Sequence, residues 1–559
     1  MQWRISPHSL CAMKWSLGAL IVSSLAISAV ALTANAPEIK NAVWRAGAER
    51  LVIKGKAASR NSIVTVSDAE SGDVLGTATV NRRKLWRLVL REPAIVPCAV
   101  TAKTNQTTAV KRVNKAPSDC GSSAVPSVPK VAEIGASAAL PELSITGREW
   151  FVRKGDTGDG SEAFPLGSIQ AALDAAQAGD GISILPGNYN ESLNTRRNGT
   201  AANPIVIQAK EGRGTVTITN NGRVLTVNHA HHQFSQLVLA GQYGQSDLIK
   251  VKTAANGWML YNSEVRESSR DCIDMDSPSN VVISESTIHH CLNAADGRTD
   301  AHGIAGASVR GLLIQNTKVH SFSGDAFQID SGRTSPGWNN VVIEGSEFWL
   351  APLPKAANGF SAGVVPGENA IDTKVRAGYR PKMTIRNSSF WGYQNGLIAN
   401  MAALNLKESV DVIVDAVTIY DSDIAFRLRY PAQVQITNTI VHSTNRAIRY
   451  EDNIAQVSIW HSTFGKGINT FFQEASSEAT TFDVRNSIFL SSSFPAEVNT
   501  ARNLVVGDSS FNGVDVNDYH LSTFSPAVDA ATPQGIGTDR FGTKRPLGNG
   551  YDMGAVESR

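Results

Sequence analysis

Charged and amide side chains recur at two positions of a six-residue phrase that is repeated between residues 247 and 451. Successive side chains of a β-strand point to opposite faces, so the fourth and sixth residues of the phrase share one face. The fourth residues are Lys250, Asp274, Ala305, Gln328, Asp372, Ile398, Arg427 and Arg449. The sixth residues are Lys252, Asp276, Ala307, Asp330, Lys374, Asn400, Arg429 and Glu451. Carboxylates gather in the early copies and cations in the later ones, which is typical of a binding face rather than of a solvated strand.

The phrase also predicts the fold. Its copies include Asp271-Cys-Ile-Asp-Met-Asp276, Asp325-Ala-Phe-Gln-Ile-Asp330, Asn369-Ala-Ile-Asp-Thr-Lys374 and Asn395-Gly-Leu-Ile-Ala-Asn400. The third residue is apolar in every copy, and the shortest steps between copies are 22 to 24 residues. Repeats of this length without helical segments between them indicate stacked coils, so we expect an all-β protein with a right-handed parallel β-helix. The third residues expected in one interior column include Ile273, Phe327, Ile371, Leu397 and Phe426.

The chain divides into four predicted parts, namely residues 1–36, 37–114, 115–147 and 148–559. In the first part, Arg4 and Lys14 precede a long apolar run that ends at Ala34-Asn-Ala36, as in a secretory signal peptide. The alternative is an uncleaved membrane anchor, and only then do we expect membrane association. We expect an exported bacterial protein, periplasmic or extracellular.

Four cysteines remain once the predicted signal is removed, and an even number in an exported protein permits disulfides. Cys98 with Cys120 and Cys272 with Cys291 are the local pairings. Cys272 also occupies the small, inward second position of its phrase, where a free buried thiol is the alternative.

Residues 37–114 contain short strands between turns and resemble a small immunoglobulin-like β-sandwich. This part has more than twice as many Lys and Arg as Asp and Glu residues. It is either a spacer with a solvated basic face, the interpretation that we favour, or a module that holds a polyanionic glycan or a cell surface. Residues 115–147, rich in Ala, Ser and Pro, are predicted to be a linker.

The last part opens with an amphipathic stretch, Pro165–Ala176, that can cap the end of a solenoid. The segment Gly179-Asp-Gly-Ile-Ser-Ile-Leu-Pro-Gly-Asn-Tyr189 and the C-terminal Tyr551-Asp-Met-Gly-Ala-Val-Glu557 resemble right-handed β-helix proteins of the pectate lyase superfold. The nearest branch is that of chondroitinase B and alginate lyases. The resemblance covers Trp150 to Glu557 and is specific for fold rather than for activity.

The resemblance implies β-elimination on an acidic polysaccharide, with a Lys or Arg base and carboxylate-held Ca²⁺ at the substrate carboxylate. On this sequence Lys374 becomes the base, Arg427 or Arg429 holds the substrate carboxylate, and His302 is the next candidate base. The predicted Ca²⁺ ligands are Asp330, Asp372, Glu368 and Asp276, the last with Asp274 in a second acidic cluster. Further substrate contacts are expected from Asp274, Gln328, Asn400 and Arg449. Chondroitinase B-like enzymes carry their lysine and arginine on neighbouring coils, whereas Ile398 and Asn400 intervene here.

Two long steps, from Ile273 to Ile304 and from Phe327 to Ile371, predict loops that flank this face as binding walls. Aromatic residues that could stack on a sugar are Trp338, Trp349, Tyr379 and Trp391, although stacks inside coils are the commoner use.

Three rival functions use the same face. The copy at Asp271–Asp276, followed by His302, partly resembles polygalacturonases, in which paired aspartates activate water. The Asp300-Ala-His302 triplet resembles the Asp-Pro-His of mannuronan epimerases, and a non-catalytic glycan-binding or surface protein is the third alternative. No phosphate-binding glycine loop or zinc-ligand spacing occurs, so neither a nucleotide nor a nucleic acid is expected. We expect a monomer.

Overall fold

The computed structural model describes residues 37–45, 50–69, 74–91, 96–104, 107–117, 120, 140, 143–294, 300–429, 432–451, 456–476 and 482–558. The chain forms two compact units, Met1–Ile134 and Gly135–Arg559. The predicted signal peptide at residues 1–36 and most of the predicted linker lie outside the described residues. Within the described part, no helix is long and apolar enough to cross a membrane.

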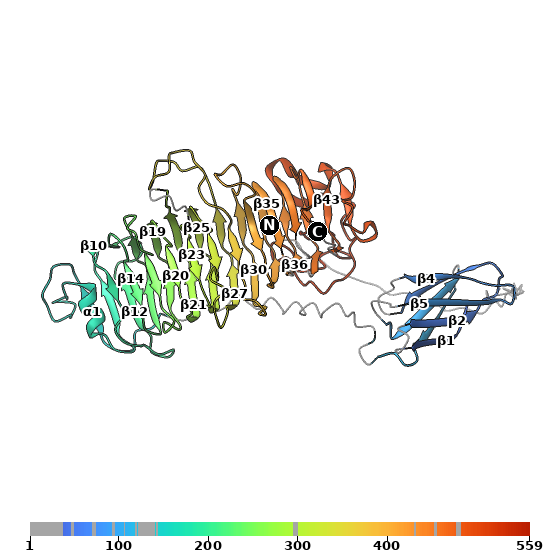
Figure 1. Ribbon diagram of the computed structural model, residues 1–559, viewed down its shortest axis with the longest axis horizontal. Helices are drawn as coiled ribbons and strands as arrows, with labels where there is room; N and C mark the ends of the chain where they lie inside the picture. The colour runs from blue at the N-terminus through green and yellow to red at the C-terminus, as the bar shows by residue number, and fades with distance from the viewer. Residues whose placement is uncertain are drawn as a thin grey trace, which may run out of the picture. The chain divides into compact units, whose positions relative to one another are not determined.

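The first unit contains two antiparallel sheets around one apolar core, as predicted for a small β-sandwich (Figure 1). The three-stranded sheet contains β1 (Glu38–Arg45), β2 (Arg50–Lys56) and β5 (Leu85–Arg91). The four-stranded sheet contains β4 (Val74–Thr79), β3 (Ile63–Asp68), β6 (Ala99–Thr104) and β7 (Thr107–Arg112). Trp86 fills the core against Gly55, where an added Cβ would lie 2.4 Å from the indole ring. The predicted Cys98–Cys120 disulfide is present.

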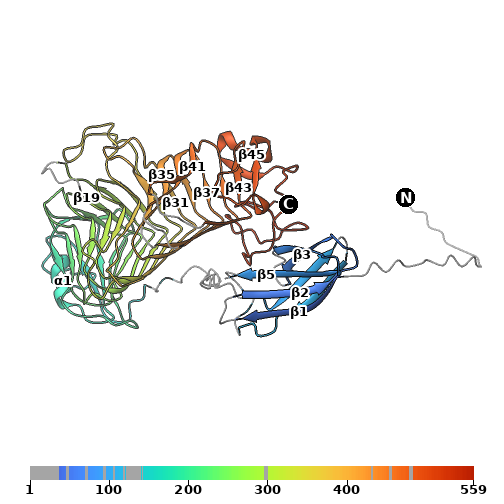
Figure 2. The same cartoon turned by 45° about the vertical axis from the view of Figure 1, so that its right-hand side comes forward.

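The second unit is a right-handed parallel β-helix, which confirms the predicted fold (Figures 1 and 2). Among the described residues, the first sheet contains β11 (Leu193–Asn194), β14 (Leu225–Val227), β17 (Ile249–Val251), β20 (Ile273–Met275), β23 (Ile304–Gly306), β26 (Phe327–Ile329), β29 (Ile371–Thr373), β32 (Ala402–Leu406), β35 (Ser422–Arg429), β38 (Thr444–Glu451) and β41 (Thr470–Glu474).

Two longer sheets complete each coil. The second sheet contains β10 (Gly187–Asn190), β13 (Val216–Thr219), β16 (Val238–Ala240), β19 (Glu264–Ser268), β22 (Thr287–Cys291), β25 (Lys318–Phe322), β28 (Glu347–Trp349), β31 (Ser389–Trp391), β34 (Thr418–Tyr420), β37 (Ile440–Val441), β40 (Thr463–Phe464), β43 (Ile488–Leu490) and β44 (Leu504–Val506). The third contains β8 (Glu149–Val152), β9 (Gly181–Ile184), β12 (Ile205–Ala209), β15 (His232–Ser235), β18 (Met259–Tyr261), β21 (Ser279–Ser284), β24 (Arg310–Gln315), β27 (Asn339–Glu344), β30 (Lys382–Arg386), β33 (Asp411–Asp415), β36 (Gln433–Thr437), β39 (Gln456–Trp460) and β42 (Phe482–Arg485).

The third residues of the phrase stack in the interior of the first sheet, as predicted. Ile273 pairs with Ile304, Phe327 pairs with Ile371, and all four side chains are fully buried. The fourth residues point outward in the same register, so Gln328 lies beside Asp372 on the outer face.

One copy of the phrase was placed wrongly. The strand after β29 is β32, in which Leu404 pairs with Ile371 and is fully buried. Leu397, which we expected in the interior column, is 66% exposed and lies in the loop before β32. Asn405 and Lys407 therefore take the outer positions that we had expected for Ile398 and Asn400.

Each coil turns from the third sheet into the second through one residue with positive φ. Asn is common at this corner, as at Asn316 (φ 48°) and Asn387 (φ 52°), because Asn tolerates the left-handed region better than most residues. The next residue is usually Ser or Thr with a buried hydroxyl. The backbone N–H of Thr317 donates to Ser346 Oγ at 3.1 Å, and that of Ser346 donates to Ser388 Oγ at 3.1 Å. These hydroxyls satisfy backbone donors that the corner leaves outside the sheets.

Both ends of the coil stack are covered. At the first end lies α1 (Ile169–Ala175), inside the predicted cap, with Ser168 Oγ accepting from the N–H of Ala171. The last coils are covered by the antiparallel pair β45 (Phe511–Gly513) and β46 (Asp518–Leu521), with 3-10 turns at Thr500–Arg502, Asp508–Ser510 and Val514–Val516.

The long segment between β28 and β29 forms a loop that stands out from the stack (Figure 1). Leu353 and Phe360 from this loop pack with Leu292 in a small apolar cluster of their own. This packing orders the loop against the preceding coils and places its last residues, Glu368 and Asn369, beside the outer face of the first sheet.

Candidate functional site

A polar pocket of about 250 Å³ lies on the outer face of the first sheet, where the two predicted columns run. The strands and the residues just beyond them supply Gln328, Asp372, Lys374, Asn405, Lys407, Arg427 and Arg429. The loops supply Asp300, His302, Glu368, Asn369 and Asn400. Most of the predicted site residues therefore line one pocket. The prediction used their positions along the strands and gave no contacts between them.

The floor of the pocket is an ion cluster centred on Asp372, which is 4% exposed. Lys407 Nζ lies 2.8 Å from Asp372 Oδ1, and Lys374 Nζ lies 3.2 Å from Oδ2. Asn405 Nδ2 also donates to Oδ1 at 3.0 Å, while Asn405 Oδ1 is buried without a hydrogen-bond partner among the described residues. Two ammonium groups on one carboxylate leave a local excess of positive charge. The amide oxygen of Asn405 is free to accept a hydrogen bond from a ligand.

The two arginines form a second cationic group. Arg427 Nε and Arg429 Nε lie 2.7 Å and 2.9 Å from the same oxygen of Glu451, one coil further on. Glu451 orients both guanidinium groups, which line the pocket next to Lys407. Since one carboxylate is shared by two guanidinium groups, this side of the pocket is also suited to an anion.

Glu368 is the titratable group that stands apart from these cations. Burial, together with the nearby Asp325 and Asp300 carboxyl groups, raises its pKa to about 7. Its backbone N–H donates to Gly324 O at 2.8 Å, which fixes the residue at the end of the long loop. A carboxyl group with a pKa near neutrality can exchange a proton with a substrate under ordinary conditions.

His302 and Asp325 form the buried support beneath Glu368. The backbone N–H of Asp325 donates to His302 Nδ1 at 2.8 Å, so neutral His302 carries its proton on Nε2. Asp325 is 1% exposed and its carboxylate accepts from Asn369 Nδ2 and Gln328 Nε2, both at 2.8 Å. Burial, and then the nearby Asp372, raises the pKa of Asp325. Because Nδ1 accepts this bond, Nε2 is the ring nitrogen of His302 that is left for a ligand in the pocket that His302 lines.

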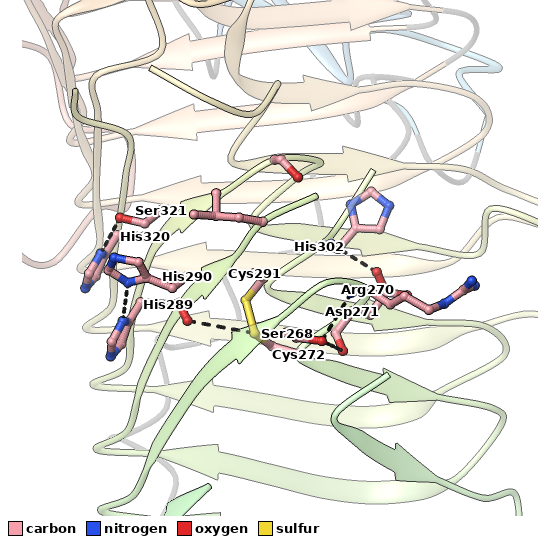
Figure 3. Close-up of a disulfide and its surroundings, with 12 residues drawn as sticks. Ser268, Arg270, Asp271, Cys272, His289, His290, Cys291, His302, His320 and Ser321 are labelled. Carbon is pink, nitrogen blue, oxygen red and sulfur yellow. Dashed lines mark hydrogen bonds between the residues drawn. A yellow bond between two sulfur atoms is a disulfide. The ribbon is translucent and has the colours of Figure 1, made fainter. Parts of the chain in front are cut away.

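A disulfide inside the coil positions this histidine (Figure 3). Cys272 and Cys291 are both fully buried and join the start of β20 to the end of β22, as predicted for the local pairing. Asp271, the neighbour of Cys272, accepts the backbone N–H of His302 at 3.0 Å. The disulfide therefore fixes the turn from which the His302 backbone is held.

Several predicted residues lie outside the pocket. Asp330 is fully buried in its own turn, where Oδ1 accepts from Thr334 N at 2.6 Å and Thr334 Oγ1 at 2.9 Å. Its φ of 58° turns the chain at this point, so its side chain leaves the column that strand alternation had predicted. Arg449 supports the site indirectly, because its Nη1 donates to Asn400 Oδ1 at 2.7 Å.

The second predicted acidic cluster is separate from the pocket. Lys250 contacts both Asp274 and Asp276, the latter at 2.7 Å, and Lys252 lies 3.3 Å from Asp276. Among the described residues, the carboxylates that converge within 4.8 Å of one another are Asp247, Asp271 and Asp274. Lys250 together with Arg223 and Arg270 pairs with these groups, so the region is a balanced ion network.

The pocket does not fit Ca²⁺. A hard cation needs several free oxygen ligands, but both oxygens of Asp372 already contact ammonium groups. Asp330 does not line the pocket and accepts hydrogen bonds in its own turn through Oδ1, and the raised pKa of Glu368 disfavours the carboxylate form that a metal requires. The positive charge that Ca²⁺ was expected to supply is present here as Lys374 and Lys407.

The predicted aromatic residues do not line this pocket. Trp338 is fully buried and donates from Nε1 to Lys374 O at 2.9 Å. Trp349 and Trp391 stack on the outer face of the second sheet, with ring centroids 4.9 Å apart and planes 3° from parallel. His320 and Tyr420 extend this stack on either side. Because the rings cover one another's faces, their main role is in coil packing.

The sequence analysis did not single out several residues of the site, among them Asn405, Lys407 and the buried Asp325. Lys407 and Asn405 belong to Ala402-Ala-Leu-Asn-Leu-Lys407, which fits the phrase. The step from Leu404 to Phe426 is 22 residues and equals the next step along the chain, which was the available signal. Asp325 opens a copy of the phrase, but nothing in the repeat indicated that its side chain would be buried under the pocket.

Fold and pocket together define a β-helix protein with a cation-rich pocket on one outer face. No family model matches the chain, and no curated protein sequence matches it. Solved structures with a similar course of the chain include a pectate lyase, with 12% identity, 74% of this chain and 98% of that chain covered, and a TM-score of 0.46. A rhamnogalacturonan lyase has 12% identity, 66% and 92% coverage and a TM-score of 0.44. An alginate lyase from Paenibacillus sp. has 16% identity, 56% and 95% coverage and a TM-score of 0.35. Identities and TM-scores this low do not indicate the activity of the chain.

Proposed function

We propose that the protein is an exported enzyme that cleaves a uronate-containing acidic polysaccharide by β-elimination. The observation that carries the proposal is the pocket itself, whose lining includes four cations and a carboxyl group with a pKa of about 7. A uronate carboxylate needs cations to bind, and its neighbouring carbon needs a base to lose its proton. Groups of both kinds line one cavity of about 250 Å³, which supports the proposal.

In the proposed reaction, ionised Glu368 takes the proton from the carbon next to the substrate carboxylate. The electron pair moves onto that carboxylate as an enolate-like charge, which Lys374 and Lys407 stabilise. The bond from the next carbon to its linked oxygen then breaks and leaves a carbon–carbon double bond. Protonated Glu368 returns its proton to the departing oxygen. His302 Nε2 and the free Asn405 Oδ1 orient substrate hydroxyl groups.

Lys374 remains the base predicted from the sequence, but we assign the proton transfer to Glu368 in preference. Lys374 Nζ lies in an ion pair with Asp372 at 3.2 Å, a placement that suits stabilisation of the developing negative charge. Arg427 and Arg429, oriented by Glu451, hold the substrate carboxylate or that of the adjoining sugar.

Hydrolysis is the second candidate, because the same Glu368 observation supports it. A carboxyl group with a pKa of about 7 is also what a glycosidase uses to protonate a leaving oxygen. The two reactions need Glu368 in opposite states, ionised for elimination and protonated for hydrolysis.

The test is incubation of the full chain with a panel of acidic polysaccharides, among them polygalacturonate and alginate. Elimination produces chain ends that absorb in the ultraviolet as unsaturated uronates, and the Glu368→Gln and Lys374→Ala variants abolish this signal. Reducing ends without that absorbance identify hydrolysis. Altered sugar ratios without scission identify epimerisation, and binding without any product identifies a glycan-binding protein. Loss of signal in Lys374→Ala but not in Glu368→Gln returns the role of base to Lys374.

A further inference from the structure

Five cations of the first unit lie on one outer face of its sandwich. Leu51 and Ile53 of β2 point into the core, so the alternate residues Arg50, Lys54 and Lys56 belong to the outer face. The strand register places Arg45 of β1 directly opposite Arg50. The same register places Arg87 of β5 directly opposite Lys54. The structure thus forms a basic face, which we define as Arg45, Arg50, Lys54, Lys56 and Arg87.

The other sheet of the same sandwich is different. Its outer face carries Thr65 opposite Thr77 and Thr101 opposite Val110, with Val110 65% exposed. Two cations lie on it, Lys103 opposite Thr108 and Arg112 opposite Ala99. Positive charge is therefore concentrated on one of the two faces, which a spacer with an evenly solvated surface does not require.

The described residues do not neutralise the basic face. None of its five cations forms an ion pair with a described residue, and Arg50 Nε is buried without a hydrogen-bond partner among those residues. Glu38, opposite Lys56 at the end of the sheet, is the acidic residue that the described strands place there. Like charges directly opposite each other on neighbouring strands destabilise a sheet. Two such pairs, Arg45–Arg50 and Lys54–Arg87, are a cost that a bound polyanion would relieve.

We propose that the basic face is a binding surface for an acidic polysaccharide, separate from the pocket of the second unit. A flat, three-stranded face with cations in successive cross-strand rows fits an extended chain that carries one carboxylate on each sugar. The choice of a polysaccharide over other polyanions rests on the proposed function, since the pocket of the same chain is built for uronate. Holding the polymer at a second site raises its effective concentration at the pocket.

The test compares two charge reversals of equal size in the full chain. Lys54→Glu/Arg87→Glu changes the basic face, and Lys103→Glu/Arg112→Glu changes the other sheet by the same net charge. Both are made in a Glu368→Gln background, so that the polymer stays intact, and retardation is measured in native gels containing polygalacturonate or alginate. We expect the first pair to weaken binding about tenfold at low salt, with the second pair close to its parent. Raised salt should remove the difference.

Equal weakening by both pairs indicates attraction by net charge alone and overturns the proposal, as does no weakening by the first pair. Vesicles rich in phosphatidylglycerol and double-stranded DNA are run in parallel. If the first pair weakens binding only to the vesicles, the surface binds a membrane. If it weakens binding only to the DNA, the surface binds a nucleic acid. Face-dependent binding of a polymer that the unmodified chain does not cleave would overturn the proposed function and leave this surface in place. Cleavage without face-dependent binding would support the proposed function and overturn the binding role of the basic face.

Discussion

Glu368 is the proposed base, and its raised pKa should also make the stability of the fold depend on pH. Its raised pKa means that the folded chain binds a proton more tightly here than the unfolded chain, whose reference pKa is 4.5. Ionisation of Glu368 in the folded state is therefore unfavourable. This cost is absent below the unfolded pKa, grows as the pH rises, and is complete above about 7.

The variant Glu368→Gln should accordingly be more stable than the parent at about pH 8 and equal to it at about pH 4. Allowing for solvent screening, we expect a gain of about 1–2 kcal/mol at the higher pH. Thermal or denaturant unfolding at the two pH values measures it. A variant that is less stable than its parent at both values would show that the carboxyl group is not destabilised by burial.

The direction of the pH–rate profile belongs to the same residue. In elimination the ionised form is active, so kcat/KM of the parent should rise through a pH of about 7. A profile that falls through this pH instead assigns Glu368 the acid role and favours hydrolysis.

The strand β32 shows what the sequence could and could not place. Leu397 and Leu404 both stand third in a phrase-like segment, and local propensity does not separate them. The coil length does, because only Leu404 keeps the spacing of 22 residues to Phe426. The third and fourth positions before β32 were predicted correctly, since there the phrase occurs once in each coil.

Two alanine variants test the corrected register. Leu404→Ala removes a fully buried side chain from the interior column and should cost about 2–5 kcal/mol. Leu397→Ala removes one that is 66% exposed and should change stability by less than about 0.5 kcal/mol. Equal losses in urea unfolding would contradict the register described here.

The contacts beneath the pocket could not be predicted from the sequence for a different reason. Asp325, His302 and Asn369 come from three segments, and their contacts depend on how two long loops return to the sheet. The repeat predicts where a strand lies, but it carries no information about the path of an insertion. Asp330 was misplaced because its positive φ ends the strand alternation one residue early.

The disulfide between β20 and β22 should matter more to the pocket than the other disulfide of the chain. Cys272→Ala/Cys291→Ala opens a loop of 19 residues and should cost about 3 kcal/mol. It should also reduce turnover, because Asp271 then holds the His302 backbone less firmly. Cys98→Ala/Cys120→Ala, in the separate first unit, is the matched control and should leave turnover unchanged. Equal turnover in both variants would remove the proposed support role.

In the β-helix, lysine and arginine side chains supply the positive charge of the pocket, and no bound Ca²⁺ is needed for it. Treatment with a chelator should therefore leave both the thermal midpoint and the cleavage of polygalacturonate or alginate unchanged, since Lys374 and Lys407 already occupy the oxygens of Asp372. Activity that disappears on chelation and returns with added Ca²⁺ would restore the metal site predicted from the sequence.

The stack of rings along the second sheet has an optical consequence. Trp349 and Trp391 are nearly parallel and in contact, and Tyr420 lies 5.5 Å from Trp391, so light absorbed by one ring can be transferred to the next. Each ring belongs to a different coil. Separation of neighbouring coils interrupts the transfer between them, so the transfer among these three rings reports whether the coils that carry them are still in contact.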